Sequence, residues 1–127
     1  MKIGIVGYSS ACFDVNKAKQ ILEGELKNLP KDTEIVSGFT NLGIPAIAYD
    51  IASKYGYKTV GIACKKAAEY ACYPCDVVKL IGINWGDESD EFLTYCDWFI
   101  RVGGGKQSFA ETYLAKEMGK FVKEFDL

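Results

Sequence analysis

Histidine is absent from this sequence of 127 residues, and arginine occurs only once, at position 101. Histidine is the commonest general base of enzymes and the commonest zinc ligand, so its absence excludes a Ser-His-Asp or Cys-His catalytic device. An excess of positive charge is also missing, because the formal net charge is −2 and the pI is near 5.2. Such a protein presents no broad basic surface, and we expect no duplex nucleic acid as a partner.

Long apolar runs are missing as well. The N-terminal apolar stretch, Met1–Gly7, is too short for the apolar core of a signal peptide that precedes a small-residue cleavage site. No run in the sequence approaches the ~20 residues that a membrane-spanning helix needs. We therefore expect a cytoplasmic protein without a membrane partner.

The number of cysteines is odd, which predicts reduced thiols rather than a disulfide framework. They are Cys12, Cys64, Cys72, Cys75 and Cys96. Cys72-Tyr73-Pro74-Cys75 has the form of a thiol-disulfide centre, but it precedes a predicted strand rather than a helix whose N-terminus would stabilise a thiolate. A redox role and a Cys-only zinc site are minor alternatives, and we expect no resident cofactor or metal.

Five short runs rich in valine and isoleucine predict the strands of a sheet. They are Ile3–Gly7, Glu34–Ser37, Thr59–Cys64, Val77–Ile81 and Trp98–Val102. Their nearly continuous hydrophobicity is typical of parallel strands that are covered on both faces. The alternating Phe121–Phe125 segment predicts a sixth strand at an edge.

Helical patterns lie between these strands. The predicted helices run from Val15 to Leu29, from Ala46 to Lys54, from Lys65 to about Tyr70, from Asp87 or Ser89 onward, and from Ser108 to Gly119. Asp14 is the predicted N-cap of the first helix, Gly56 suits the left-handed end of the second, and Ser108 with Glu111 forms a predicted capping box. The alternation predicts one α/β domain, residues 1–127: a Rossmann-like, doubly wound, mainly parallel sheet of five to six strands with helices on both faces.

Three of the predicted strands are followed by loops of glycine and small polar residues. The candidate nucleotide- or phosphate-binding residues are Gly7, Ser9 and Ser10 in the first loop, Ser37, Gly38, Thr40, Asn41 and Gly43 in the second, and Gly103, Gly104, Gly105, Lys106, Gln107 and Ser108 in the third. Such loops leave backbone amides open to an anion, although each alone could be only a tight turn. Because parallel strands end at one edge of the sheet, we expect the loops to share one cleft.

The third loop is the most informative. Its glycines allow close backbone approach, the following helix dipole favours an anion, and Lys106 adds a mobile cation. A phosphate is therefore predicted there. The loop lacks the spacing of a Walker A motif, and no Gly-x-Gly-x-x-Gly follows the first strand, so ATP hydrolysis and ordinary dinucleotide binding lose support.

The segment Gly104–Glu111 resembles the Pro-Gly-Gly-x-Gly-Thr-x-x-Glu signature of the lysine-decarboxylase-like, or "lonely guy", proteins. Their wider Rossmann-like superfamily includes molybdenum-cofactor-carrier-like proteins and the DNA-processing Rossmann domain. The first two loops are similar to that family's glycine loops. The resemblance implies a homodimer that binds a nucleoside monophosphate, with the phosphate on Gly104–Ser108 and Glu111 near the ribose.

The enzymes of that family are phosphoribohydrolases that use the signature glutamate together with an arginine. Here Glu88 stands where the arginine is expected, Gly103 replaces the proline of the signature, and Gln107 replaces its third glycine. Exchanging a guanidinium for a carboxylate changes the local charge by two units, which favours binding over catalysis. We therefore expect a nucleotide-binding sensor or carrier. The alternatives are a phosphoribohydrolase with Glu111 as its catalytic residue and a protein-interaction module.

Three other features keep two interpretations each. The acidic segment Asp87–Glu91 supplies either charge to a helix N-terminus or ligands to magnesium. Trp85 either packs or stacks on a base. Arg101 either forms a salt bridge, at the rim of the sheet or at a dimer contact, or takes the role of the displaced catalytic arginine.

Overall fold

The computed structural model describes residues 1–9 and 12–127, and in this part of the chain six strands form one sheet in the order β4-β3-β2-β1-β5-β6. The strands are β1 (Lys2–Gly7), β2 (Glu34–Ser37), β3 (Lys58–Ala63), β4 (Val77–Leu80), β5 (Trp98–Val102) and β6 (Val122–Phe125). All neighbouring strands pair in parallel. The predicted parallel α/β sheet is confirmed, with β6 at an edge.

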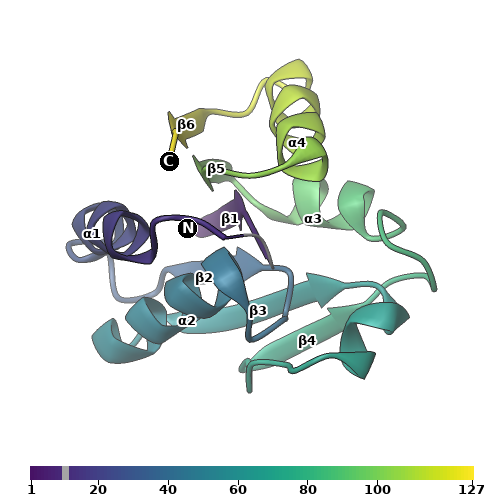
Figure 1. The fold of residues 1–127 in the computed structure, drawn as a ribbon, viewed down its shortest axis with the longest axis horizontal. Coiled ribbons are helices and arrows are strands. Elements are labelled where there is room, and N and C mark those ends of the chain that lie inside the picture. Colours follow the sequence, from purple (N-terminus) through teal and green to yellow (C-terminus); the bar gives the residue numbers. More distant parts are fainter. Residues whose placement is uncertain (10–11) are drawn as a thin grey trace.

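The helices cover both faces of this sheet (Figure 1). They are α1 (Val15–Leu26), α2 (Gly43–Tyr55), the 3-10 helix η1 (Lys65–Glu69), α3 (Ser89–Tyr95) and α4 (Lys106–Glu117). The alternation of side chains along each strand separates two cores: Ile3 and Ile5 pack with α1 and α2, whereas Val6 packs with α3 and α4. The sheet is therefore doubly wound, as predicted. No helix in the described residues is long and apolar enough to cross a membrane.

Some of the local signals act as the sequence predicts. The carboxylate of Asp14 accepts a hydrogen bond from the backbone amide of Lys17 at 3.0 Å and caps α1. Gly56 ends α2 in the left-handed conformation, with φ of 78°. The predicted bounds of α1 and α2 were wrong by three residues at one end, since α1 stops at Leu26 and α2 already starts at Gly43.

The predicted capping box of Ser108 and Glu111 was wrong. Gly103 and Gly104, at φ of 61° and 115°, turn the chain so early that α4 begins at Lys106 and Gly105 becomes its N-cap. Ser108 therefore lies inside the first turn, where its hydroxyl donates to the carbonyl of Gly7 at 3.3 Å. The glutamate reaches another helix instead of its own N-terminus.

The order of the strands also places the switch point of the fold. The chain runs outward from β1 to β4 and then returns to the other side of β1 as β5. In open α/β sheets, ligands bind outside the carboxyl ends of the strands at such a reversal. The cleft is therefore expected at the ends of β1 and its neighbours.

Candidate functional site

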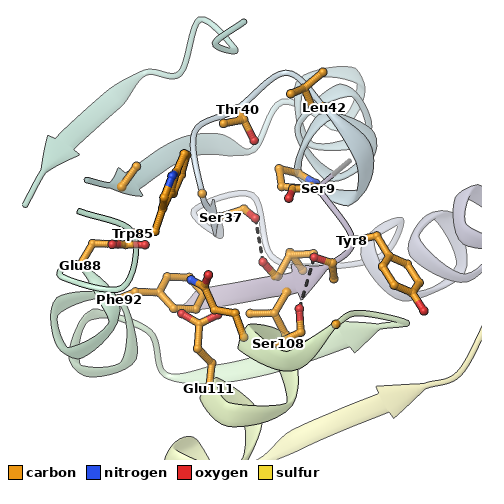
Figure 2. A pocket seen from close by; sticks show the side chains of 18 of the residues that line it. Tyr8, Ser9, Ser37, Thr40, Leu42, Trp85, Glu88, Phe92, Ser108 and Glu111 are labelled. Atoms are coloured by element: carbon orange, nitrogen blue, oxygen red, sulfur yellow. Dashed lines mark hydrogen bonds between the residues drawn. The ribbon is translucent and has the colours of Figure 1, made fainter. Parts of the chain in front are cut away.

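A cavity of about 530 Å³ lies at this point, and all three predicted loops contribute to it (Figure 2). The predicted site residues that line it are Gly7, Ser9, Ser37, Gly38, Thr40, Gly105, Lys106, Gln107, Ser108 and Glu111. They come from the ends of β1 and β2, the loops that follow them, and the first turns of α4. The expected convergence of loops far apart in the sequence is present in the structure.

Four predicted residues do not line the cavity, namely Asn41, Gly43, Gly103 and Gly104, and Ser10 lies outside the described residues. At the three glycines of this group, the packing of the chain leaves no room for a side chain. A Cβ on Gly43 would lie 2.3 Å from the carbonyl oxygen of Tyr8, one on Gly103 would lie 2.6 Å from the Tyr8 ring, and one on Gly104 would lie 2.5 Å from the Cβ of Ser108. These glycines allow the loops to pack against each other.

Gly38 and Gly105 differ from those three glycines. Neither has a positive φ, and nothing lies within 4 Å of the position that a Cβ would occupy. The backbone conformation and the packing therefore do not require glycine at either position. Both residues line the cavity, so their missing side chains leave room inside it.

The N-terminus of α4 supplies the hydrogen-bond donors at one end of the cavity. The first amides of a helix have no intrahelical acceptor, and Gly105 has no side chain that could cap those of Lys106, Gln107 and Ser108. The hydroxyls of Ser37 and Ser108 donate to the β1 carbonyls of Ile5 and Gly7 at 2.7 and 3.3 Å. The amides, the helix dipole and the exposed Lys106 are thus the features that favour an anion here.

Two glutamates, Glu88 and Glu111, lie at the other end of the cavity. Figure 2 shows both of them near Phe92. Glu88, only 7% exposed, accepts a hydrogen bond from the amide of Gly86 at 3.1 Å. Glu111 accepts one from the hydroxyl of Ser89 at 3.3 Å. Burial, and to a smaller extent the negative charge of Glu88, raise the pKa of Glu111 from 4.5 to about 7.

A tight turn positions this acidic end. The Asp87 carboxylate accepts hydrogen bonds from the amides of Ile83 and Asn84 at 3.0 and 2.9 Å, and these bonds lower the pKa of Asp87. The turn carries Trp85 and Glu88 to the cavity. In residues 1–9 and 12–127, no three side chains of the metal-binding types gather into a metal site. The acidic segment thus shapes a turn and the start of α3.

The apolar wall of the cavity was not assigned from the sequence, apart from Trp85. It includes Tyr8 and Leu42 from the first two loops, Pro45 in the first turn of α2, Tyr70 after η1, and Phe92 on α3. Tyr8 and Leu42 stand inside the glycine loops, and this position was the signal that could have identified them. Phe92 carried no such signal, because an apolar residue on a short helix has the pattern of a core residue.

Arg101 forms the expected salt bridge at the rim of the sheet. Arg101 is 4% exposed, and its guanidinium lies 3.3 Å from the carboxylate of Glu124 and 2.8 Å from that of Asp126. It also donates to the carbonyl of Gly103 at 2.7 Å, which braces the third loop from behind. Since Arg101 is the only arginine in the sequence and does not line the cavity, the cavity contains no guanidinium.

The Cys72 and Cys75 thiols do not have the environment of a redox centre. Burial raises the pKa of Cys75 to about 11, whereas reactive cysteines have a lowered pKa. The Cys72 thiol donates to the carbonyl of Ala67 at 3.4 Å. Both cysteines are free in the structure.

No protein-family model and no curated protein sequence matches the chain. Solved structures do match. A molybdenum cofactor carrier protein from Chlamydomonas reinhardtii is 20% identical, with a TM-score of 0.80 over 98% of this chain and 75% of that chain. The molybdenum cofactor binding protein from Rippkaea orientalis is 20% identical, with a TM-score of 0.80 over 99% and 76%.

A structural-genomics protein, TM1055, is 23% identical, with a TM-score of 0.76 over 95% of this chain and 71% of that chain. The chain has the same Rossmann-like α/β fold as these three proteins. The resemblance seen in the loop motifs is thereby confirmed at the level of the fold. At these identities the likeness establishes the fold alone.

Proposed function

We propose that this protein binds a small phosphate-bearing ligand, a nucleotide or a compound derived from one, as a carrier or sensor. The observation that carries the proposal is the uncapped N-terminus of α4, which opens at Gly105 into the cavity of about 530 Å³. Helix N-termini bind phosphate, and cavities of about 300–1,000 Å³ hold ligands of this size. The phosphate would accept hydrogen bonds from the amides of Lys106–Ser108, beside the charge of Lys106.

The solved structures of the same fold support a carrier rather than an enzyme. Two of them are proteins that carry or bind the molybdenum cofactor. We extend to this chain the binding of a small cofactor-like molecule, with a planar heterocycle against the aromatic wall of Trp85 and Phe92. Hydrolysis of a base-ribose bond is not favoured, because the cavity has Glu88 beside Glu111 and no arginine.

We further propose that the protein is a cytoplasmic homodimer. The side of α4 away from the sheet exposes Tyr113, Leu114 and Met118 at 63%, 43% and 47%, and Phe121 follows at 60%. A second copy would cover these side chains. Reduced thiols are typical of the cytoplasm. Sedimentation of the wild type and of Tyr113→Glu tests the dimer, which the charged side chain should dissociate.

Isothermal titration calorimetry with nucleoside monophosphates, nucleoside diphosphates, dinucleotides, cyclic nucleotides and a phosphorylated pterin tests the binding. At least one phosphate-bearing compound should bind, and its unphosphorylated form should bind at least about tenfold more weakly, which is about 1.4 kcal/mol. No heat from any of them with the folded protein would contradict the proposal. Release of free base that depends on Glu111 would show an enzyme instead.

Two valine substitutions locate the phosphate. Gly105→Val adds a branched side chain at the mouth of the cavity, in space that is empty. It should weaken binding by about tenfold or more without unfolding the protein. Gly24→Val is the matched control, since Gly24 on α1 also has nothing within 4 Å of its Cβ position and lies away from the cavity. Equal affinity of both variants would place the phosphate elsewhere.

A further inference from the structure

The cavity is chemically asymmetric. At the N-terminus of α4, which we call the α4 end, the cavity offers amide donors and a lysine. At the start of α3, the α3 end, it offers the carboxylates of Glu88 and of Glu111, which reaches from α4 to Ser89 (Figure 2). Trp85 and Phe92 also line the cavity. A phosphate at the α3 end would face two carboxylates and be repelled. A ligand with one phosphate is thus oriented with its heterocycle at the carboxylates.

Glu88 lacks the partner that a buried carboxylate needs. Its side chain is 7% exposed, and one of its oxygens accepts a hydrogen bond from the amide of Gly86 at 3.1 Å. Within the described part of the chain, no lysine or arginine nitrogen lies within 4.0 Å of Glu88 or Glu111. A buried charge without a cation is unfavourable unless hydrogen-bond donors compensate it.

The chemistry of a carboxylate selects the ligand edge that meets it. A carboxylate only accepts hydrogen bonds, and its two oxygens match two adjacent N–H groups. A 2-amino-4-oxopyrimidine ring, the ring shared by guanine and pterins, presents a ring N–H beside an exocyclic amino group. Adenine presents an acceptor nitrogen beside its amino group, and uracil flanks its N–H with carbonyl oxygens, so both would repel a carboxylate at one position.

We propose that Glu88 determines specificity by accepting hydrogen bonds from the ring N–H and the exocyclic amino group of a 2-amino-4-oxopyrimidine, while Trp85 contacts the ring face. This inference rests on the proposed phosphate-ligand function and names the class of ligand. Trp85 lines the cavity, is 48% exposed and packs at a tilt against the ring of Tyr70, with 5.7 Å between the ring centroids. Among the described residues, no third His, Cys, Asp or Glu side chain gathers with the two glutamates into a metal site.

Calorimetric titration of the wild type with GMP, IMP and AMP tests the recognition one group at a time. IMP keeps the ring N–H and loses the exocyclic amino group, whereas AMP loses both features. GMP should bind about tenfold more tightly than IMP and about 100-fold more tightly than AMP. Neopterin monophosphate, which carries the same edge without a purine, distinguishes a pterin from a guanine ligand by its affinity relative to GMP.

Two variants test the contribution of the Glu88 carboxylate to specificity. Glu88→Gln replaces one acceptor with a donor, so the preference for GMP over AMP should fall by about tenfold or more, with ribose 5-phosphate affinity unchanged. Glu91→Gln, on α3 next to Glu88, with a side chain that is 42% exposed and does not line the cavity, should keep the full preference. Thermal melts confirm that both variants are folded.

The outcomes separate this inference from the function on which it rests. If ribose 5-phosphate and all of the nucleotides bind with similar affinity, phosphate binding stands and the role of Glu88 is overturned. A preference for AMP, or a GMP preference that survives Glu88→Gln, overturns it as well. If neither ribose 5-phosphate nor any nucleotide or pterin binds, the proposed function fails and this inference fails with it.

Discussion

Gly43 and Gly105 both stand at the start of a helix beside the cavity, yet the structure requires glycine only at the first. Gly43 has a φ of 57°, and a Cβ there would lie 2.3 Å from the Tyr8 carbonyl oxygen. Gly105 has a φ of −102° and open space at its Cβ position. One glycine allows the chain to fold, and the other leaves room beside a helix N-terminus.

The N-terminal amides of α2 and α4 also differ in whether another loop already accepts their hydrogen bonds. At α2, the amide of Ile44 donates to the carbonyl of Tyr8 at 2.7 Å, so a loop of the protein occupies this helix N-terminus. Neither helix has a side-chain cap, but among the described residues no backbone carbonyl of another loop accepts from the first amides of α4. Two loops with similar composition therefore have different roles, and of these two helix starts the one at α4 is available to an anion.

A methyl group at Gly43 should cause the largest loss of stability. Gly43→Ala should destabilise the protein by about 2–4 kcal/mol, because the methyl group meets a backbone carbonyl and the positive φ disfavours alanine. Urea unfolding monitored by circular dichroism measures the change. A variant as stable as the wild type would show that α2 can move away from Tyr8.

A smaller loss of stability is expected when Arg101, which holds the third loop through Gly103, is replaced. Arg101→Ala should cost about 2 kcal/mol, because it removes the hydrogen bond to Gly103 and a buried guanidinium that pairs with Glu124 and Asp126. Lys54→Ala is the control, since the Lys54–Glu23 pair is largely exposed and should contribute less than about 1 kcal/mol. Equal losses in denaturant unfolding would contradict the role of burial.

The pH dependence of stability, compared between the wild type and Glu111→Gln, tests the acidic end of the cavity. The folded state holds the Glu111 proton more tightly than the unfolded state, because burial raises its pKa from 4.5 to about 7. The stability this contributes is present below pH 4.5 and is lost as the pH rises through about 7.

Relative to the wild type, the Gln variant should therefore gain stability between pH 5 and pH 8.5, on the order of 1–2 kcal/mol. Urea unfolding at the two values measures this gain. Glu117→Gln, at an exposed position of the same helix, is the control and should leave the pH dependence of the wild type unchanged. A constant difference between the Glu111→Gln variant and the wild type would sink the assignment.

A methyl group at Gly105 should have the smallest effect on stability. Gly105→Ala should change the free energy of unfolding by less than about 1 kcal/mol, because the conformation and the space both accept a methyl group. The same holds for Gly38→Ala. A loss comparable to that of Gly43→Ala would mean that these glycines serve the fold.

Much of the fold was predictable because its signals are local. The valine- and isoleucine-rich runs gave five parallel strands, and Asp14 and Gly56 mark helix ends by chemistry confined to a few residues. The capping box of Ser108 and Glu111 failed because the same short pattern suits an N-cap and a first turn. Tertiary contacts to Gly7 and Ser89 decided between them.

For the site, composition alone determined which chemistry is missing, since a chain without histidine and with a single arginine has few catalytic devices. The loops also indicated which strand ends would form the cleft. Only the tertiary structure decided which glycines leave open space, which helix start stays open, and how far the pKa of Glu111 rises. Those properties depend on burial and on the packing of α3 against α4, and both arise between segments that are distant in the sequence.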